Sequence, residues 1–170
     1  MKEMRKLLGE ESGFTLVELA IGLVIIGLLI GAILGGAAMI KNAKIRRQAT
    51  DLQGLYAACY TYFDKFEQLP GDRDGNGQFD ADSTVWNDLQ TQNLAQKVRR
   101  SPFGGSYMFG WSDDSTTYHK IGNYVDISIP SDVAGNIDKQ LDDGVYNSGN
   151  ITASADYTGQ ARVDLYYFID

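Results

Sequence analysis

The amino-acid sequence predicts an α+β protein in which one long N-terminal helix packs on a small antiparallel β-sheet. An apolar run extends from Phe14 to Ile40, and an amphipathic helical pattern continues it to Leu69 without a polar break. The rest of the chain, 70–170, consists of short alternating segments separated by loops. The sequence contains 19 glycines, 10 tyrosines and 3 prolines, a composition that favours a turn-rich sheet domain.

The first part of the long helix, 14–40, has the composition of a membrane span. Glu18 is its only ionisable residue, and about 20 apolar residues in a helix cross the hydrocarbon core of a bilayer. A helix buried in a protein core is the alternative. The preceding segment, 1–13, is short and charged and lacks the apolar centre of an ordinary signal peptide.

The second part of the long helix, 41–69, is striped instead of apolar all round. Pro70 and Gly71 are expected to end it. The stripe has a period of three or four residues and predicts a face that lies on the sheet. Its members are Ile45, Ala49, Leu52, Tyr56, Cys59, Phe63 and Phe66.

The C-terminal domain, 70–170, is expected to contain two further helices and three strands. Ser83 and Ser131 are candidate N-caps of the helices, and Gly122-Asn123 is a possible turn. In chain order the expected elements are a helix at 83–96, strands at 106–111 and 118–129, a helix at 131–144 and a strand at 162–170.

Composition argues against enzymatic and nucleic-acid functions. The chain of 170 residues has 15 Lys and Arg against 22 Asp and Glu, a net charge of −7, whereas nucleic-acid binding needs clustered cations. With one histidine, His119, and one cysteine, Cys59, zinc sites and Cys–His nucleophile pairs are essentially excluded. We therefore predict no catalytic set, and we expect Cys59 to be a buried core thiol that cannot form an internal disulfide.

The segment Gly13-Phe14-Thr15-Leu16-Val17-Glu18 resembles the type IV prepilin family, which includes the pseudopilins of type II secretion. The short charged leader, the Gly-Phe junction, the glutamate four residues later and the long apolar helix all match. The resemblance implies the pilin fold. It also implies that a prepilin peptidase removes the leader 1–13 by cutting after Gly13 and that the new N-terminus, Phe14, is methylated.

The same resemblance implies two successive locations for the protein. The subunit waits in the inner membrane with its C-terminal domain in the periplasm. An inner-membrane assembly platform then adds it, with other pilin-like subunits, to a periplasmic or extracellular helical filament. Glu18 is expected to meet the Phe14 amine of a neighbouring subunit, because an unpaired carboxylate is costly in a low-dielectric bundle. Stabilisation of Glu18 by its own helix dipole is compatible with that.

Three questions stay open at this stage. Cations lie on both sides of the span, so the positive-inside rule conflicts with the periplasmic placement that the resemblance implies. Gly35-Gly36 either melts on assembly or packs closely between helices. A stand-alone membrane-anchored calcium-binding or adhesive module is the alternative function, and the sequence does not separate major pilin, minor pilin and pseudopilin.

An acidic loop at 72–83 resembles the first part of an EF-hand calcium loop. Calcium prefers six or more oxygen ligands, and alternate residues of a tight loop point theirs inward. Gly77 permits the sharp bend, but Ser83 stands where a bidentate glutamate is expected. A second acidic, turn-rich patch begins at Asp142-Asp143. The candidate ligands in the first loop are Asp72, Asp74, Asn76, Gln78, Asp80 and Asp82.

Overall fold

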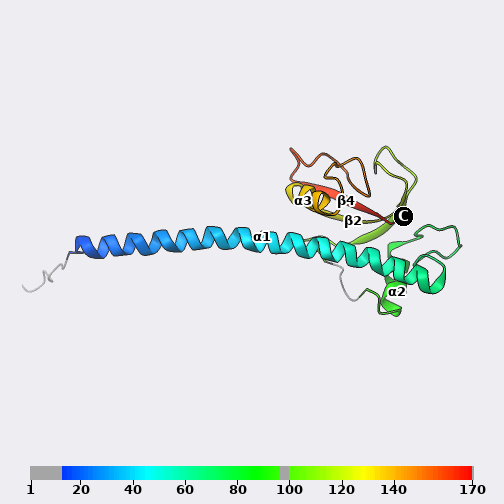
Figure 1. Ribbon diagram of the computed structural model, residues 1–170, viewed down its shortest axis with the longest axis horizontal. Coiled ribbons are helices and arrows are strands. Elements are labelled where there is room, and N and C mark those ends of the chain that lie inside the picture. Colours follow the sequence, from blue (N-terminus) through cyan, green and yellow to red (C-terminus); the bar gives the residue numbers. More distant parts are fainter. Residues whose placement is uncertain (1–12, 96–99, 170) are drawn as a thin grey trace, which may run out of the picture. The chain divides into compact units, whose positions relative to one another are not determined.

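The computed structural model describes residues 13–95 and 100–169. The chain divides into two units, one ending at Lys41 and the other beginning at Asn42. Figure 1 labels the three helices and the strands β2 and β4. In chain order the elements are α1 (Leu16–Phe66), α2 (Asp82–Thr91), β1 (Met108–Ser112), β2 (Gly122–Pro130), α3 (Ser131–Leu141), β3 (Ile151–Ala153) and β4 (Arg162–Ile169).

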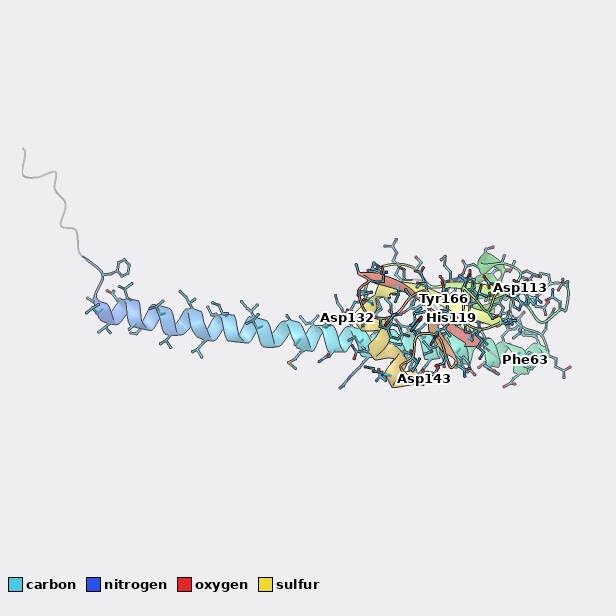
Figure 2. All side chains as sticks on the ribbon, turned by 90° about the horizontal axis from the view of Figure 1, so that it is seen from above. Phe63, Asp113, His119, Asp132, Asp143 and Tyr166 are labelled. Atoms are coloured by element: carbon cyan, nitrogen blue, oxygen red, sulfur yellow. The ribbon has the colours of Figure 1, made fainter. Side chains whose placement is uncertain are left out.

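The predicted single long helix is confirmed: α1 is continuous over 51 residues. It contains an apolar stretch with a mean hydropathy of 2.7, none of which is buried, so by length and composition α1 is a candidate membrane span. Figure 2 shows the side chains of this stretch projecting from the helix. From Leu16 to Ile40 the large apolar side chains are more than half exposed.

The second part of α1 contributes one face to the core of the C-terminal unit. Leu52 and Cys59 are fully buried, as the stripe predicts. The stripe is wrong at its end, because Phe63 and Phe66 are 44% and 42% exposed. The helix ends at Phe66, before Pro70, and Glu67 follows with a φ of 54°. The buried face also includes Gln48, Leu55 and Ala58, which the stripe omits.

The sheet has four antiparallel strands in the order β1-β2-β4-β3. The central pair sets the register, with Val125 opposite Tyr167 and Ile127 opposite Leu165. Along β2, buried and half-buried residues alternate strictly, which is the period of a strand with one face on a core. The helix α3 contacts β2, β3 and β4.

Both predicted short helices exist, but their caps differ from expectation. The N-cap of α2 is Ala81 instead of Ser83, and no side chain caps that end. The N-cap of α3 is Pro130, and the hydroxyl of Ser131 donates to the carbonyl of Gln160 instead. The two helices also end earlier than predicted, at Thr91 and Leu141; the last residue of the first predicted helix, Gln96, lies outside the described residues.

The three predicted strands exist, but β1 begins at Met108 instead of 106 and β2 begins at Gly122 instead of 118. Gly122-Asn123 is the start of β2, because both residues pair with neighbouring strands instead of forming a turn. The short strand β3 was not predicted, and it is held by its pairing with β4. Along β4 the expected alternation holds at Val163 and Leu165.

Candidate functional site

The N-terminal junction presents the predicted processing residues on an accessible segment. Gly13 and Phe14 precede α1, and Phe14 is 80% exposed. Thr15 and Glu18 form a reciprocal capping arrangement at the helix start. The Glu18 carboxylate accepts hydrogen bonds from Thr15 N at 3.1 Å and Thr15 Oγ1 at 3.0 Å, and Glu18 N donates to Thr15 Oγ1 at 3.2 Å.

This arrangement accounts for a carboxylate at the start of an apolar helix. The free N–H groups of the first turn and the positive end of the helix dipole both favour a negative group there. The Glu18 side chain nevertheless remains exposed. One of its oxygens, Oε2, accepts both bonds from Thr15, so the carboxylate retains acceptor capacity for a second partner.

The acidic loop brings three of its six predicted ligands together. Carboxylate oxygens of Asp72, Asp74 and Asp80 lie within 4.8 Å of one another. Asp72 is 4% exposed, and the other two are exposed. Such a group of hard oxygen donors has the chemistry that Ca²⁺ prefers.

Backbone amides shape this loop around its acidic side chains. Asp72 accepts hydrogen bonds from Gly75 N at 2.7 Å and Gly77 N at 2.9 Å. Asp80 accepts one from Arg73 N at 2.8 Å. Gly77 has a φ of 80°, which confirms that a glycine supplies the bend. The loop is thus closed by hydrogen bonds from its own backbone amides to its carboxylates.

The other three predicted ligands are placed less favourably. Asn76 Oδ1 accepts from Gln78 N at 2.8 Å, and Asn76 Nδ2 donates to Asp74 at 3.0 Å, so this amide is engaged inside the loop. Asp82 lies outside the convergent group and begins α2. Its Oδ1 atom accepts from the backbone amide of Phe109 at 2.9 Å.

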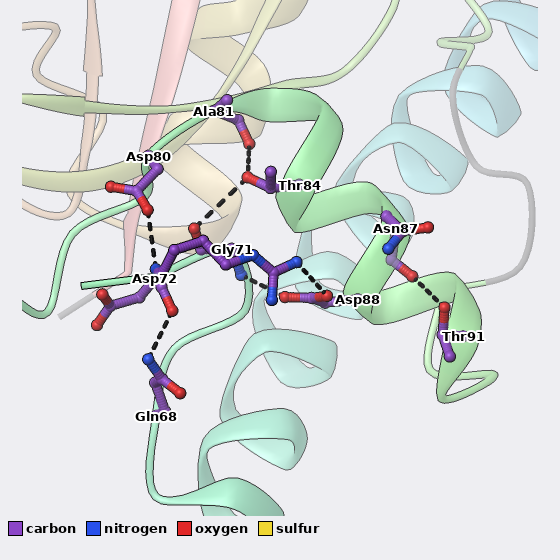
Figure 3. A network of polar contacts seen from close by, with 10 residues as sticks. Gln68, Gly71, Asp72, Asp80, Ala81, Thr84, Asn87, Asp88 and Thr91 are labelled. Carbon is purple, nitrogen blue, oxygen red and sulfur yellow. Dashed lines mark hydrogen bonds and ion pairs between the residues drawn. The ribbon is translucent and has the colours of Figure 1, made fainter. Parts of the chain in front are cut away.

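Asp88 anchors the start of the loop from α2 (Figure 3). Its carboxylate accepts from Gly71 N at 2.8 Å and forms a 2.7 Å ion pair with Arg73. Gly71 has a φ of 78°, and a Cβ there would lie 2.6 Å from a methyl carbon of Val85, so only glycine fits this approach. Asp88 was not predicted from the sequence. A single acidic residue beside Val85 and Leu89 on an apolar helix face could have indicated a buried polar contact.

Asn123 anchors the far end of the loop from β2. Its Oδ1 atom accepts from Phe79 N at 2.7 Å, and its Nδ2 donates to the Gly77 carbonyl at 2.8 Å. Phe79 itself is buried and packs edge-on against Phe109 at 5.6 Å. Phe79 therefore anchors the loop in the core, and Asn123 is an additional anchor that no local pattern indicated.

The second acidic patch is organised differently. Carboxylate oxygens of Asp138, Asp142 and Asp143 also lie within 4.8 Å of one another. Their oxygens are used by the protein: Asp138 accepts from Tyr157 Oη at 2.6 Å, and Asp142 accepts from Ile151 N at 2.8 Å. These bonds close the chain between α3 and β3, so the patch has a structural explanation.

The single histidine does not take part in a reactive constellation. His119 is half-buried and has a φ of 63°. Its ring packs edge-on against Tyr146 at 5.5 Å. Figure 2 labels it within the C-terminal unit. This contact agrees with a packing role for His119.

Comparison with known proteins identifies the N-terminal segment. Residues 10–34 match the family model of the prokaryotic N-terminal methylation motif. No curated protein and no solved structure matches the chain significantly. The motif defines a type IV prepilin-like N-terminus and confirms the resemblance at Gly13 to Glu18.

The fold agrees with this class. A long apolar N-terminal helix followed by a four-stranded antiparallel sheet is consistent with the pilin fold. The motif and the fold together support a type IV pilin-like or pseudopilin precursor family. The prepilin motif implies processing by a prepilin peptidase and assembly with other pilin subunits, and the apolar N-terminal helix fits an anchor in the inner membrane.

Proposed function

We propose that this chain is the precursor of a filament subunit, cut after Gly13, methylated at Phe14 and polymerised through the apolar part of α1. The observation that carries the proposal is the methylation motif at 10–34, joined to a helix whose apolar side chains from Leu16 to Ile40 are unburied. A surface of this size needs lipid or protein around it. In a filament whose apolar helices form a bundle, the neighbouring helices provide these protein surroundings.

Glu18 has a specific part in this proposal. Cutting after Gly13 creates a positive amine at Phe14, and a carboxylate moved from lipid headgroups into an apolar bundle needs such a partner. The Glu18 carboxylate is held by Thr15 in its own helix. The positive Phe14 amine of a neighbouring subunit would neutralise the Glu18 carboxylate, and this pairing would fix the register between subunits.

The mature N-terminus tests the processing step. We expect mass spectrometry of the purified membrane form to show a chain that starts at N-methylated Phe14. A chain that retains Met1 would instead support the alternative of a stand-alone membrane-anchored calcium-binding or adhesive module.

Two substitutions separate assembly from helix capping. Glu18→Ala removes the carboxylate, whereas Thr15→Ala removes its capping partner and leaves the charge in place. We expect both variants to insert into the membrane and only Glu18→Ala to lose most of the sheared filament fraction. Equal filament yields from the wild type and Glu18→Ala would contradict the proposed pairing.

We further propose that the C-terminal unit lies in the periplasm. The peptidase that removes the leader faces the cytoplasm in the prepilin class, and the leader must therefore stay on that side. A C-terminal fusion to a reporter that matures only in the periplasm should be active. An inactive periplasmic fusion together with an active cytoplasmic reporter would reverse the orientation.

Calcium binding by the acidic loop is a second proposal, supported by the convergence of Asp72, Asp74 and Asp80. Like charges this close repel one another, and a divalent cation would relieve the repulsion. Asp72, Asp74 and Asp80 would hold the ion. We expect millimolar calcium to raise the melting temperature of the full-length protein in detergent relative to chelator.

A matched pair of variants localises the calcium effect. Asp74→Asn removes a charge from the convergent group, whereas Asp113→Asn removes the same charge from an exposed position outside the loop. The calcium-induced rise should disappear in the first variant and persist in the second. A melting temperature that calcium leaves unchanged in the wild type would remove the proposal.

A further inference from the structure

The C-terminal unit has an apolar groove at the end of α1. Its volume is about 810 Å³, and it lies between the last turn of α1, the acidic loop and the ends of β1, β2 and β4. The aromatic lining includes Tyr60, Phe63, Phe66 and Trp111. Phe63, labelled in Figure 2, and Phe66 are each more than 40% exposed, which is unusual for two aromatic side chains so close together.

The charged groups of the groove all carry one sign. Glu67 and Asp72 line it, and among the described residues no Lys, Arg or His does. Lys65, in the same helical turn, does not line the groove; its ammonium donates to Gln92 and lies 5.2 Å from the centre of the Phe66 ring. The groove also receives the C-terminal end of α1, where the helix dipole is negative. Its occupant is therefore expected to combine apolar side chains with cations.

A segment of that chemistry lies earlier on the same helix. Lys44, Arg46 and Arg47 are exposed and form a basic patch, with Ile45 beside them partly buried. Lys44 and Arg47 are three residues apart and share one helical face. Arg47 has a side chain that is 69% exposed and only a 3.7 Å contact to Asp51, so its charge is available to a partner.

One copy of the chain cannot join these two surfaces. Lys44 and Phe63 belong to the continuous helix α1 and are separated by roughly five turns, or about 28 Å. The match can therefore be made only between copies. Because the two surfaces differ, a contact that always runs from the groove of one copy to the patch of the next is heterologous, and its repetition generates either a ring or the open helical series of a filament.

We propose that the groove of one subunit docks the basic patch of a second copy. This inference rests on the proposed filament and names a contact that would order its C-terminal units. Phe63 and Phe66 would pack on the aliphatic stems of the arginine and lysine side chains, and the exposed carboxylate of Glu67 would face their charged ends.

Cysteine cross-linking in assembled filaments tests this contact. Two single variants, Lys44→Cys and Gln68→Cys, are expressed together in the full chain and mildly oxidised. Gln68 lines the groove, and the native Cys59 is fully buried. We expect a disulfide-linked dimer from this pair but not from Lys44→Cys with Ser115→Cys, a matched control at an exposed position outside the groove.

Charge exchange gives an independent readout. Glu67→Lys and Arg47→Glu, each alone in the cross-linking background, should lower the dimer yield by about tenfold, because like charges then face each other. The two changes expressed in separate copies should restore it. If the yield of cross-linked dimer does not change in these charge-reversed variants, the proposed contact is wrong.

The outcomes separate this inference from the filament itself. If filaments form but the Lys44→Cys and Gln68→Cys pair gives no dimer, the contact is wrong and the proposed function stands. If the wild-type chain forms no filament at all, both proposals fall.

Discussion

Asn123 Oδ1 accepts a 2.7 Å hydrogen bond from the backbone amide of Phe79, across 44 positions of the chain. The same side chain donates to the Gly77 carbonyl at 2.8 Å. One side-chain amide near the start of β2 therefore satisfies two backbone groups of the acidic loop. The loop is fixed to the sheet through Asn123, independently of any ion.

The first prediction concerns this amide. Asn123→Ala leaves two backbone groups without their partners, and each unsatisfied buried group costs about 1–3 kcal/mol. We expect the free energy of unfolding of the full-length protein in detergent to fall by roughly 2–4 kcal/mol. Asn87→Ala, at an exposed position of α2, is the control and should change it little. Similar losses in both variants would contradict the anchor.

The second prediction ranks the two partners of an ion pair. The Asp88 side chain is 10% exposed and that of Arg73 is 53% exposed. Asp88→Ala also leaves the Gly71 amide without its acceptor, and we expect a loss of about 2–3 kcal/mol. Arg73→Ala leaves Asp88 bonded to Gly71, and the exposed ion pair is screened by solvent, so we expect a smaller loss from this variant. Denaturant unfolding of both variants checks the order, and the reverse order would contradict it.

The third prediction concerns pH. Burial, with the neighbouring Asp164 as a second cause, raises the pKa of Asp126 to about 6. Between pH 4 and 6 the folded state retains a proton that the unfolded state releases, so stability falls as the pH rises through this range. Above about pH 6 this loss is complete.

The Asp126→Asn variant isolates that effect. Because the side chain is only partly buried, we expect a gain of roughly 1–2 kcal/mol at pH 7, less than the pKa shift alone would give. The difference between variant and wild type should shrink toward pH 4. Unfolding curves at several pH values measure it, and a difference that does not vary with pH would show that Asp126 does not titrate in this range.

The fourth prediction concerns the single thiol. Cys59 is fully buried, and burial raises the pKa of its thiol far above the usual range. Since the thiolate is the reactive form, iodoacetamide should leave the native protein unmodified and should alkylate it once in guanidinium chloride. Intact-mass measurement distinguishes the two. Rapid alkylation of the native protein would contradict the packing of α1 on its core.

The parts of the fold that the sequence predicted are those with a local signal. The stripe containing Leu52 and Cys59 and the alternation of β4 follow from the periods of helix and strand. The strand β3 was not predicted, because three residues, Ile151–Ala153, are too few to show an alternation. Gly122-Asn123 has turn-like chemistry, but pairing with β1 and β4 overrides that preference.

The candidate site divides in the same way. The spacing of Asp72, Asp74 and Asp80 is local, and the structure brings their carboxylates together. The anchors Asp88 and Asn123 lie 17 and 44 positions from the backbone amides they accept. No spacing rule connects residues so distant, because their meeting depends on how α2 and β2 pack.

The length of the apolar part of α1 has a consequence for the subunit in a membrane. The helical run from Leu16 to Ile40 is about 38 Å long, whereas the hydrocarbon core is about 30 Å thick. A single helix of this kind must tilt, thicken the surrounding lipid, or expose about one and a half apolar turns in the headgroup region. The isolated subunit is thus slightly mismatched to its bilayer, and any partner that shields the surplus length lowers the free energy of leaving it.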